Sequence, residues 1–201
     1  MLATAASSRA SARPSIRRYH NAQDGCWHVQ LTQGDMHVTG EANEVLTTIL
    51  GSCIAACIRD RDLGIGGMNH FLLPEGDAQG TEAQRYGVYA MELLINAILS
   101  RGARRDRLEA KLFGGANVLA GVTSIGTRNA AFAREFLSDE GIAVIGGNVG
   151  GTSPRRILYW PHSGRARQLL MPTKSVVIET ELRKAKTESV ELEGRDSVEF
   201  F

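Results

Sequence analysis

The 201-residue sequence has little cysteine, almost no net charge and no long apolar run. Its three cysteines, Cys26, Cys53 and Cys57, cannot all pair with one another, which argues against a disulfide framework and favours a reducing cytoplasm. A net charge of +1 gives no electrostatic reason to expect nucleic acid or a membrane surface as the partner. No stretch approaches the roughly eighteen uninterrupted apolar residues of a membrane span, so we expect no membrane insertion.

The composition that is present, 43% hydrophobic and 22% charged residues, suits one globular domain with tails. We expect a disordered basic tail over residues 1–25, because its first part is rich in arginine, alanine and serine and has no acid. An organelle-targeting peptide is the alternative, whereas the apolar stretch of a secretory signal is missing. The single domain is expected over 26–186, followed by an acidic tail over 187–201.

Hydrophobic periodicity predicts a chain of mixed secondary structure. We expect an early hairpin, three apolar strands, a long helix, a strand, a second helix, a short strand, a late hairpin and a last helix. Their expected ranges are 27–31 with 36–39, 45–50, 53–58, 65–73, 86–101, 108–113, 127–140, 142–145, 157–160 with 168–171, and 173–186. Because strands gather early and late, we predict mixed or mainly antiparallel sheets in a layered α/β sandwich with packed helices.

Cys53 and His70 stand in an apolar stretch whose only charges lie between Arg59 and Asp62. If a two-residue turn at Arg61-Asp62 joins two strands, Cys53 lies directly opposite His70, with β-carbons about 4.5–5.5 Å apart. A loop one residue longer would place them on opposite faces of the sheet, and a loop two residues longer would make them diagonal neighbours.

A lone buried cysteine is usually a small hydrophobe, and a lone histidine is usually a satisfied core residue. Two features favour a reactive pair instead. Cys53 follows Gly51-Ser52, where backbone N–H groups can gather around an oxyanion, and the glycines before His70 leave space beside it. Cys57 and Cys26 have no such setting and are expected to be structural.

Metal and nucleotide sites are not predicted, and no cofactor is expected. Zinc needs three or four ligands at characteristic spacings, which the remaining histidines do not show. The glycine-rich stretches "FGGAN" and "GGNVGG" fit neither phosphate-binding pattern and are expected to form tight turns.

The stretches "TILGSCIAACIRD" and "GIGGMNHFLLP" resemble the signature of the CheD family, the chemoreceptor glutamine deamidases of chemotaxis. Four further stretches agree in order and spacing, so the resemblance extends from about Gly34 to about Met171. They are "YGVYAMELLINAILSRGA", "RLEAKLFGGANV", "IGTRNAAFAREFL" and "GIAVIGGNVGGTSPRRILYWPHSGR".

The resemblance implies a fold similar to that of bacterial toxin deamidases and a Cys-His site. It places the nucleophile on Cys53, the base on His70 and a third catalytic residue, a threonine, on Thr47, with Thr48 as its neighbour. It implies a protein-glutamine glutaminase that converts glutamines of methyl-accepting chemotaxis receptors to glutamate through a thioester. It also implies the CheC phosphatase as a partner.

Chemically, an imidazolium beside a thiol should lower the cysteine pKa below its free value, which would prepare Cys53 for attack on an amide. Two alternatives stay open. The chain could be a non-enzymatic regulator that binds receptors and the CheC phosphatase, or a transglutaminase-like enzyme that passes its thioester to an amine.

Overall fold

The structure, a computed structural model, describes residues 16–74, 81–118 and 125–172. The described residues form ten strands, two α-helices and one short 3-10 helix. In chain order these are β1 Arg17–Asn21, β2 Cys26–Gln30, β3 Met36–Thr39, β4 Glu44–Leu50, β5 Ile54–Asp60, β6 Ile65–Asn69, α1 Thr81–Leu99, η1 Arg105–Arg107, β7 Leu108–Gly114, α2 Ile125–Asp139, β8 Ala143–Val149, β9 Arg155–Trp160 and β10 Arg165–Leu170.

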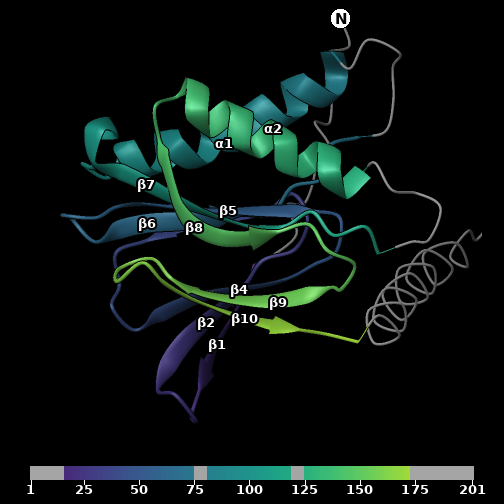
Figure 1. Cartoon of the computed structure of the whole chain (residues 1–201). Coiled ribbons are helices and arrows are strands. Elements are labelled where there is room, and N and C mark those ends of the chain that lie inside the picture. Colours follow the sequence, from purple (N-terminus) through teal and green to yellow (C-terminus); the bar gives the residue numbers. More distant parts are fainter. Residues whose placement is uncertain (1–15, 75–80, 119–124, 173–201) are drawn as a thin grey trace, which may run out of the picture.

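Three layers make up the fold, as Figure 1 shows: two helices cover one sheet, and that sheet faces a second one. The helix-covered sheet has the order β3-β6-β5-β7-β8, and the outer sheet has the order β1-β2-β4-β9-β10. Most neighbouring strands are antiparallel, while β2 with β4 and β7 with β8 are parallel. The predicted class, a layered α/β sandwich with mixed sheets and packed helices, is confirmed.

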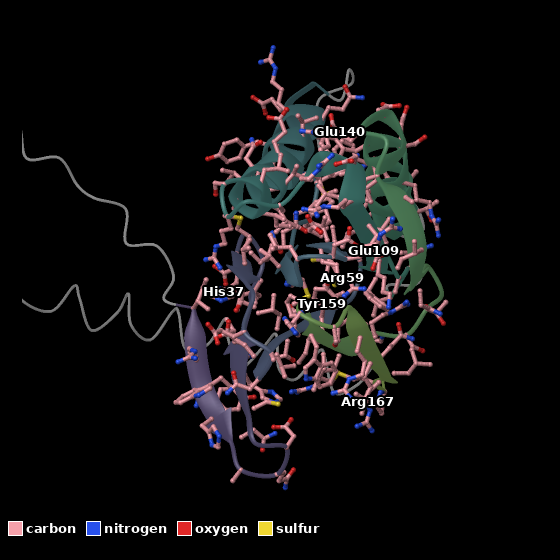
Figure 2. All side chains as sticks on the ribbon, turned by 90° about the vertical axis from the view of Figure 1, so that its left-hand side faces the viewer. His37, Arg59, Glu109, Glu140, Tyr159 and Arg167 are labelled. Carbon is pink, nitrogen blue, oxygen red and sulfur yellow. The ribbon has the colours of Figure 1, made fainter. Side chains whose placement is uncertain are left out.

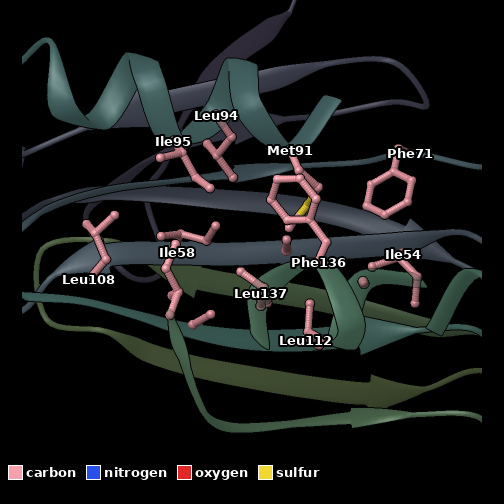
Figure 3. Close-up of a cluster of buried hydrophobic side chains, with 14 of the residues drawn as sticks. Ile54, Ile58, Phe71, Met91, Leu94, Ile95, Leu108, Leu112, Phe136 and Leu137 are labelled. Atoms are coloured by element: carbon pink, nitrogen blue, oxygen red, sulfur yellow. The ribbon is translucent and has the colours of Figure 1, made fainter. Parts of the chain in front are cut away.

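One hydrophobic core lies between the helices and the inner sheet. Figure 3 shows its side chains, among them Met91, Leu94 and Ile95 of α1 over Ile54 and Ile58 of β5. These five side chains are at most 1% exposed. Burying an aliphatic side chain of this size contributes about 1.5–3 kcal/mol, so this layer holds the helices on the sheet.

A second core lies between the two sheets. Leu46 and Leu50 of β4 and Tyr159 of β9 pack there with Ala55 and Cys57 of β5. Alternation along β5 therefore sends successive side chains to different cores, since neighbouring strand residues point to opposite faces. Figure 2 shows Tyr159 in the middle of the molecule, close to the ion pair of Arg59 and Glu109.

The N-terminal part of the fold differs from the predicted tail, because Arg17–Asn21 forms β1 rather than disordered chain. Arg18 explains this. Its guanidinium bonds the buried carboxylate of Glu44 at 2.9 Å and lies 4.2 Å from the ring centre of Trp27. Charge and aromatic contacts thus secure an edge strand that lacks an apolar pattern.

The predicted early hairpin is wrong. β2 pairs with β1 and β4 in the outer sheet, whereas β3 pairs with β6 in the inner sheet. The turn between them exists, and it carries the chain from one sheet to the other.

The connection between β5 and β6 is two residues longer than predicted. Asp60 pairs with Ile65, which leaves a four-residue loop of residues 61–64. The buried carboxylate of Asp60 accepts the N–H groups of Asp62 and Leu63 at 3.0 and 3.1 Å, and Gly64 takes a positive φ of 68°. An Asx-type cap therefore lengthens the turn.

The remaining elements expected on the described residues agree with the structure, apart from shifts of a few residues at their ends. The tight turn expected at "GGNVGG" is wrong, because its first four residues belong to β8. The late hairpin pairs Trp160 with Arg165. The last helix, predicted over 173–186, and the acidic tail lie outside the described residues. Within the described ranges, no helix has the length and apolar character needed to cross a membrane.

Candidate active site

Cys53 and His70 come to the same face of the inner sheet. Their chain neighbours Ile54 and Phe71 form an antiparallel bridge, with both backbone N···O distances at 2.9 Å. Cys53 precedes one member of this bridge and His70 precedes the other, so the two are diagonal neighbours. This is the arrangement predicted for a loop two residues longer. Diagonal neighbours on paired strands are about 7–8 Å apart.

A threonine of the opposite sheet fixes the imidazole of His70. The Nδ1 atom of His70 lies 2.8 Å from Thr48 Oγ1, and the Thr48 hydroxyl donates to the carbonyl oxygen of Leu31 at 2.9 Å. Because that hydroxyl has only one proton, its oxygen accepts from Nδ1–H. The neutral ring then has its lone pair on Nε2, which is the atom that can take a proton.

The resemblance placed a catalytic threonine on Thr47, whereas the threonine that bonds His70 in the structure is Thr48. Adjacent residues of β4 point to opposite faces. Thr48 shares its face with Leu46 and Leu50, which belong to the core between the sheets, and His70 reaches that core as well. Thr47 is buried, at 4% exposed, on the other face of the strand.

The turn of residues 32–35 holds the backbone of His70. Gly34 N–H donates to the His70 carbonyl at 2.7 Å, and His70 N–H donates to the Asp35 carbonyl at 3.0 Å. Within the turn, the Asp35 carboxylate accepts both the N–H and the hydroxyl of Thr32 at 2.7 Å. The histidine is therefore fixed at its backbone by this turn and at its ring by Thr48.

Three consecutive carbonyl groups anchor the turn before the nucleophile. Gly51 O accepts from Ala116 N at 2.9 Å, Ser52 O accepts from Asn129 Nδ2 at 2.9 Å, and Cys53 O accepts from Gly115 N at 2.8 Å. In a trans peptide the N–H points away from the C=O of the same unit. The N–H groups of Ser52 and Cys53 therefore point away from these anchors.

The first glycine of "FGGAN", Gly114, allows β7 to pack closely against the nucleophile turn. A Cβ on Gly114 would lie 2.1 Å from the carbonyl oxygen of Cys53, and the φ of Gly114 is +107°. Only glycine allows β7 to approach the nucleophile turn this closely. No tight turn forms at this stretch: Gly114 ends β7, and the residues after it continue as irregular chain against the nucleophile turn.

Asn129 was not singled out from the sequence. It is fully buried on α2, and its amide bonds Ser52 O while its carbonyl accepts the N–H of Leu73 at 3.0 Å. One side chain thus joins the segments on either side of the Cys-His pair. A signal was available, since Asn129 lies one helical turn before Ala133 on the face predicted to be apolar.

The two cysteines of this region are protonated at neutral pH. Burial raises the pKa of the Cys53 thiol to about 11, and burial raises the pKa of Cys57 further. The expectation that Cys53 has a lowered pKa is therefore wrong for this state of the protein. Its half-buried thiol is neutral until a base removes the proton.

Gln33 and Tyr86 border Cys53 on its accessible side. The Cys53 thiol contacts Gln33 Oε1 at 3.8 Å, and both Gln33 and Tyr86 are exposed. The pKa of Tyr86 is raised by partial burial and by the nearby negative charge of a Cys53 thiolate. Cys57 lies in the core between the sheets, while Cys26 is half-buried in β2.

Metal ligands do not gather in the described part of the chain. No group of three or more histidine, cysteine, aspartate or glutamate side chains there is placed to hold an ion. The chemistry available at this site is that of a thiol, an imidazole and backbone N–H groups.

Several curated proteins are similar to this chain, and each of the following is named "Probable chemoreceptor glutamine deamidase CheD". One from Caulobacter sp. (strain K31) is 59% identical over 145 residues, 71% of this chain and 77% of the relative. One from Caulobacter vibrioides (strain NA1000 / CB15N) is 56% identical over 155 residues, 76% and 83% of the two chains. One from Rhizobium meliloti (strain 1021) is 49% identical over 176 residues, 86% and 95% of the two chains.

A family model described as "CheD chemotactic sensory transduction" matches residues 72–168. Two solved structures align at 14% identity. A Neisseria meningitidis protein of family DUF152 has a TM-score of 0.41 over 59% of this chain and 54% of its own. A hypothetical Bacillus licheniformis protein has a TM-score of 0.38 over 57% and 50%. The likeness to toxin deamidases stays a prediction.

Proposed function

Because the chain belongs to the CheD family, we propose that it is a protein-glutamine deamidase that acts on the cytoplasmic part of chemotaxis receptors. Cys53 is the nucleophile, His70 is the base and Thr48 orients the imidazole. One observation carries this assignment: the Thr48 hydroxyl bonds His70 Nδ1 at 2.8 Å, which leaves Nε2 as the proton acceptor.

The first step joins proton transfer to attack. Because the pKa of Cys53 is raised to about 11, the resting thiol is neutral and His70 must remove its proton as the substrate arrives. The sulfur then attacks the Cδ carbon of a receptor glutamine. The side chain of His70 becomes an imidazolium, and its Nδ1–H stays on the Thr48 hydroxyl.

The second step stabilises the oxyanion and releases ammonia. The N–H groups of Ser52 and Cys53 are the proposed donors, because the carbonyls of their peptides are bonded on the opposite side by Ala116 and Asn129. Imidazolium Nε2 gives its proton to the leaving nitrogen, so ammonia departs and a thioester remains.

In the last step His70 activates water, which hydrolyses the thioester to glutamate and restores the thiol. The product has one more negative charge than the substrate. On a receptor helix this changes the balance of like charges and creates a carboxylate that can be methylated. The signalling effect is therefore an electrostatic switch.

The test is incubation of the full chain with receptor cytoplasmic fragments, followed by peptide mass spectrometry for glutamine converted to glutamate. We expect Cys53→Ala to reduce conversion at least about 10⁴-fold, since the covalent route is lost. Cys57→Ala is the matched control, because Cys57 lies in the sheet core, and it should keep most of the activity.

Three other results would contradict this proposal. Equal conversion by wild type and Cys53→Ala would remove the nucleophile assignment. Binding of receptors and the CheC phosphatase without any conversion would make the chain a non-enzymatic regulator. Glutamine loss that requires an added amine and releases no glutamate would indicate a transglutaminase-like enzyme.

A further inference from the structure

A glutamine of the protein itself occupies the approach to the nucleophile. Gln33 Oε1 lies 3.8 Å from Cys53 Sγ, and the thiol donates to it. The side chain of Gln33 ends in the same carboxamide group that the enzyme attacks in the proposed reaction.

The segment that carries Gln33 is firmly placed. Gln33 lies in the turn of residues 32–35, which the Asp35 carboxylate closes through two bonds to Thr32 and which bonds the His70 backbone on both sides. The same turn therefore positions the base and presents a carboxamide to the thiol. An attached reactant of this kind has an effective concentration far above that of a free one.

Rotation of the terminal amide completes the approach. The last torsion of a glutamine side chain is broad, so rotation about Cγ–Cδ can present the face of the carboxamide to the sulfur, and rotation about the earlier side-chain torsions can bring Cδ closer without moving the backbone. Gln33 is exposed, which leaves room for this rotation and for water.

We propose that Gln33 is a self-modification site: Cys53 deamidates it within the same chain and converts it to glutamate. The proposal rests on the deamidase function given above. It adds an intramolecular substrate, a carboxamide in an exposed turn of the enzyme, to the receptor glutamines.

The steps balance as they do for a receptor substrate. The thiol proton passes to His70 Nε2 as the bond between Cys53 Sγ and Gln33 Cδ forms. The Cδ–N bond then breaks, and ammonia leaves with the proton from Nε2. Solvent water cleaves the thioester, which restores the thiol and leaves a carboxylate at position 33.

The product has a regulatory consequence at the same site. A carboxylate at position 33 places a negative charge beside the nucleophile and so disfavours the thiolate that forms during attack. We therefore expect Gln33→Glu, which mimics the product, to deamidate receptor glutamines several-fold more slowly than Gln33→Ala.

The experiment compares wild type with Cys53→Ala by peptide mapping of the full-length proteins. Cleavage before Asp24 and Asp35 gives one peptide that contains both Gln33 and Gln30. Gln30 is the internal control, since it lies within β2. Incubation in heavy-oxygen water shows whether the new carboxylate comes from hydrolysis during the assay.

We expect glutamate at position 33 in wild type, glutamine there in Cys53→Ala, and glutamine at position 30 in both. Conversion should not depend on enzyme concentration, and Cys53→Ala mixed with wild type should stay unmodified, because the reaction is intramolecular.

Three results would overturn the inference. Gln33 that stays unmodified in an enzyme able to deamidate receptor fragments rejects self-modification while the proposed function stands. Equal glutamate at position 33 in wild type and Cys53→Ala shows spontaneous loss of the Gln-Gly amide. If neither Gln33 nor any receptor glutamine is converted, the proposed function fails as well.

Discussion

The two faces of β5 pack against different layers. Ile54, Ala56 and Ile58 point to the helices, are 0% exposed and belong to the helix-side core. On the other face, Ala55 and Cys57 continue the line of Cys53 into the core between the sheets. There the apolar packing gives way to Thr48 and His70.

This difference separates packing from chemistry. On the helix-side face, Ile54, Ala56 and Ile58 contribute packing, and Asn69 beside them accepts the N–H of Ala56 at 3.0 Å. On the sheet-side face, Thr48 bonds both Leu31 O and His70. Asn129 bonds Ser52 O and Leu73 N in the same way at the edge of the site. Stability and chemistry can therefore be changed separately.

The largest expected contrast is between two thiols on the same face. With Cys26 replaced by serine, Cys53 should react with iodoacetamide about 100-fold more slowly at neutral pH than a free thiol, because its pKa is raised from 9.0 to about 11. Cys57 is 1% exposed and should react at least about a thousandfold more slowly than Cys53, since labelling requires unfolding.

The pH dependence of labelling shows in which direction the pKa of Cys53 is shifted. Only the thiolate reacts, and a raised pKa means that its fraction grows about tenfold per pH unit until the pH passes the pKa. The Cys53 rate should thus keep rising to about pH 11. A rate that levels off near neutral pH would instead show a thiolate stabilised by imidazolium, as first expected.

The next contrast separates the two faces by stability. Ile58→Ala should lower the free energy of unfolding by about 2–5 kcal/mol, since it opens a cavity in the helix-side core. The activity per folded molecule should stay close to that of wild type. Cys53→Ala should do the reverse, with stability within about 1 kcal/mol of wild type and activity lost.

Urea unfolding and receptor deamidation, measured on both variants, check this contrast. If Ile58→Ala remains fully stable, the helix-side face does not hold the fold as described. If Cys53→Ala unfolds as easily as Ile58→Ala, the sheet-side face is mainly structural.

The smallest expected effect distinguishes two adjacent threonines. Thr48→Ala should lower kcat about tenfold, because His70 loses the oxygen that accepts its Nδ1–H, and a hydrogen bond to a charged group contributes about 1.5–3 kcal/mol. Thr48→Ser keeps the hydroxyl and should restore most of the rate. Thr47→Ala should stay within about twofold of wild type.

Deamidation kinetics of the three folded variants measure this. A tenfold loss in Thr47→Ala, with Thr48→Ala unchanged, would favour the residue that the family resemblance indicated. It would also show that the bond between Thr48 and His70 does not persist during the reaction.

One strand of each sheet could be predicted from the sequence within a residue of its ends: β4 of the outer sheet and β7 of the inner sheet. β4 is a largely apolar run that ends before glycine, and β7 alternates apolar and charged residues before two glycines. The partners of β2 and β3 could not be predicted from local pattern. A turn such as Gln33-Gly34-Asp35 indicates a reversal of the chain, and it does not say whether the two strands join the same sheet.

The site was predicted in its residue types and missed in its details. The resemblance placed a catalytic threonine at position 47, whereas strand alternation brings Thr48 to His70. The register between β5 and β6 depends on the length of the loop that Asp60 caps. A change of one residue in that loop would have changed the register, and the sequence pattern did not fix the loop length. The contact of Gln33 with Cys53 depends on a crossing between sheets that periodicity does not show.

The bond between Thr48 and His70 joins one sheet to the other across the middle of the sandwich. Any sliding of one layer over the other stretches this bond long before either layer loses its strands. On gentle heating, catalysis should therefore be lost before secondary structure, so the activity of the enzyme reports how well the two sheets are aligned.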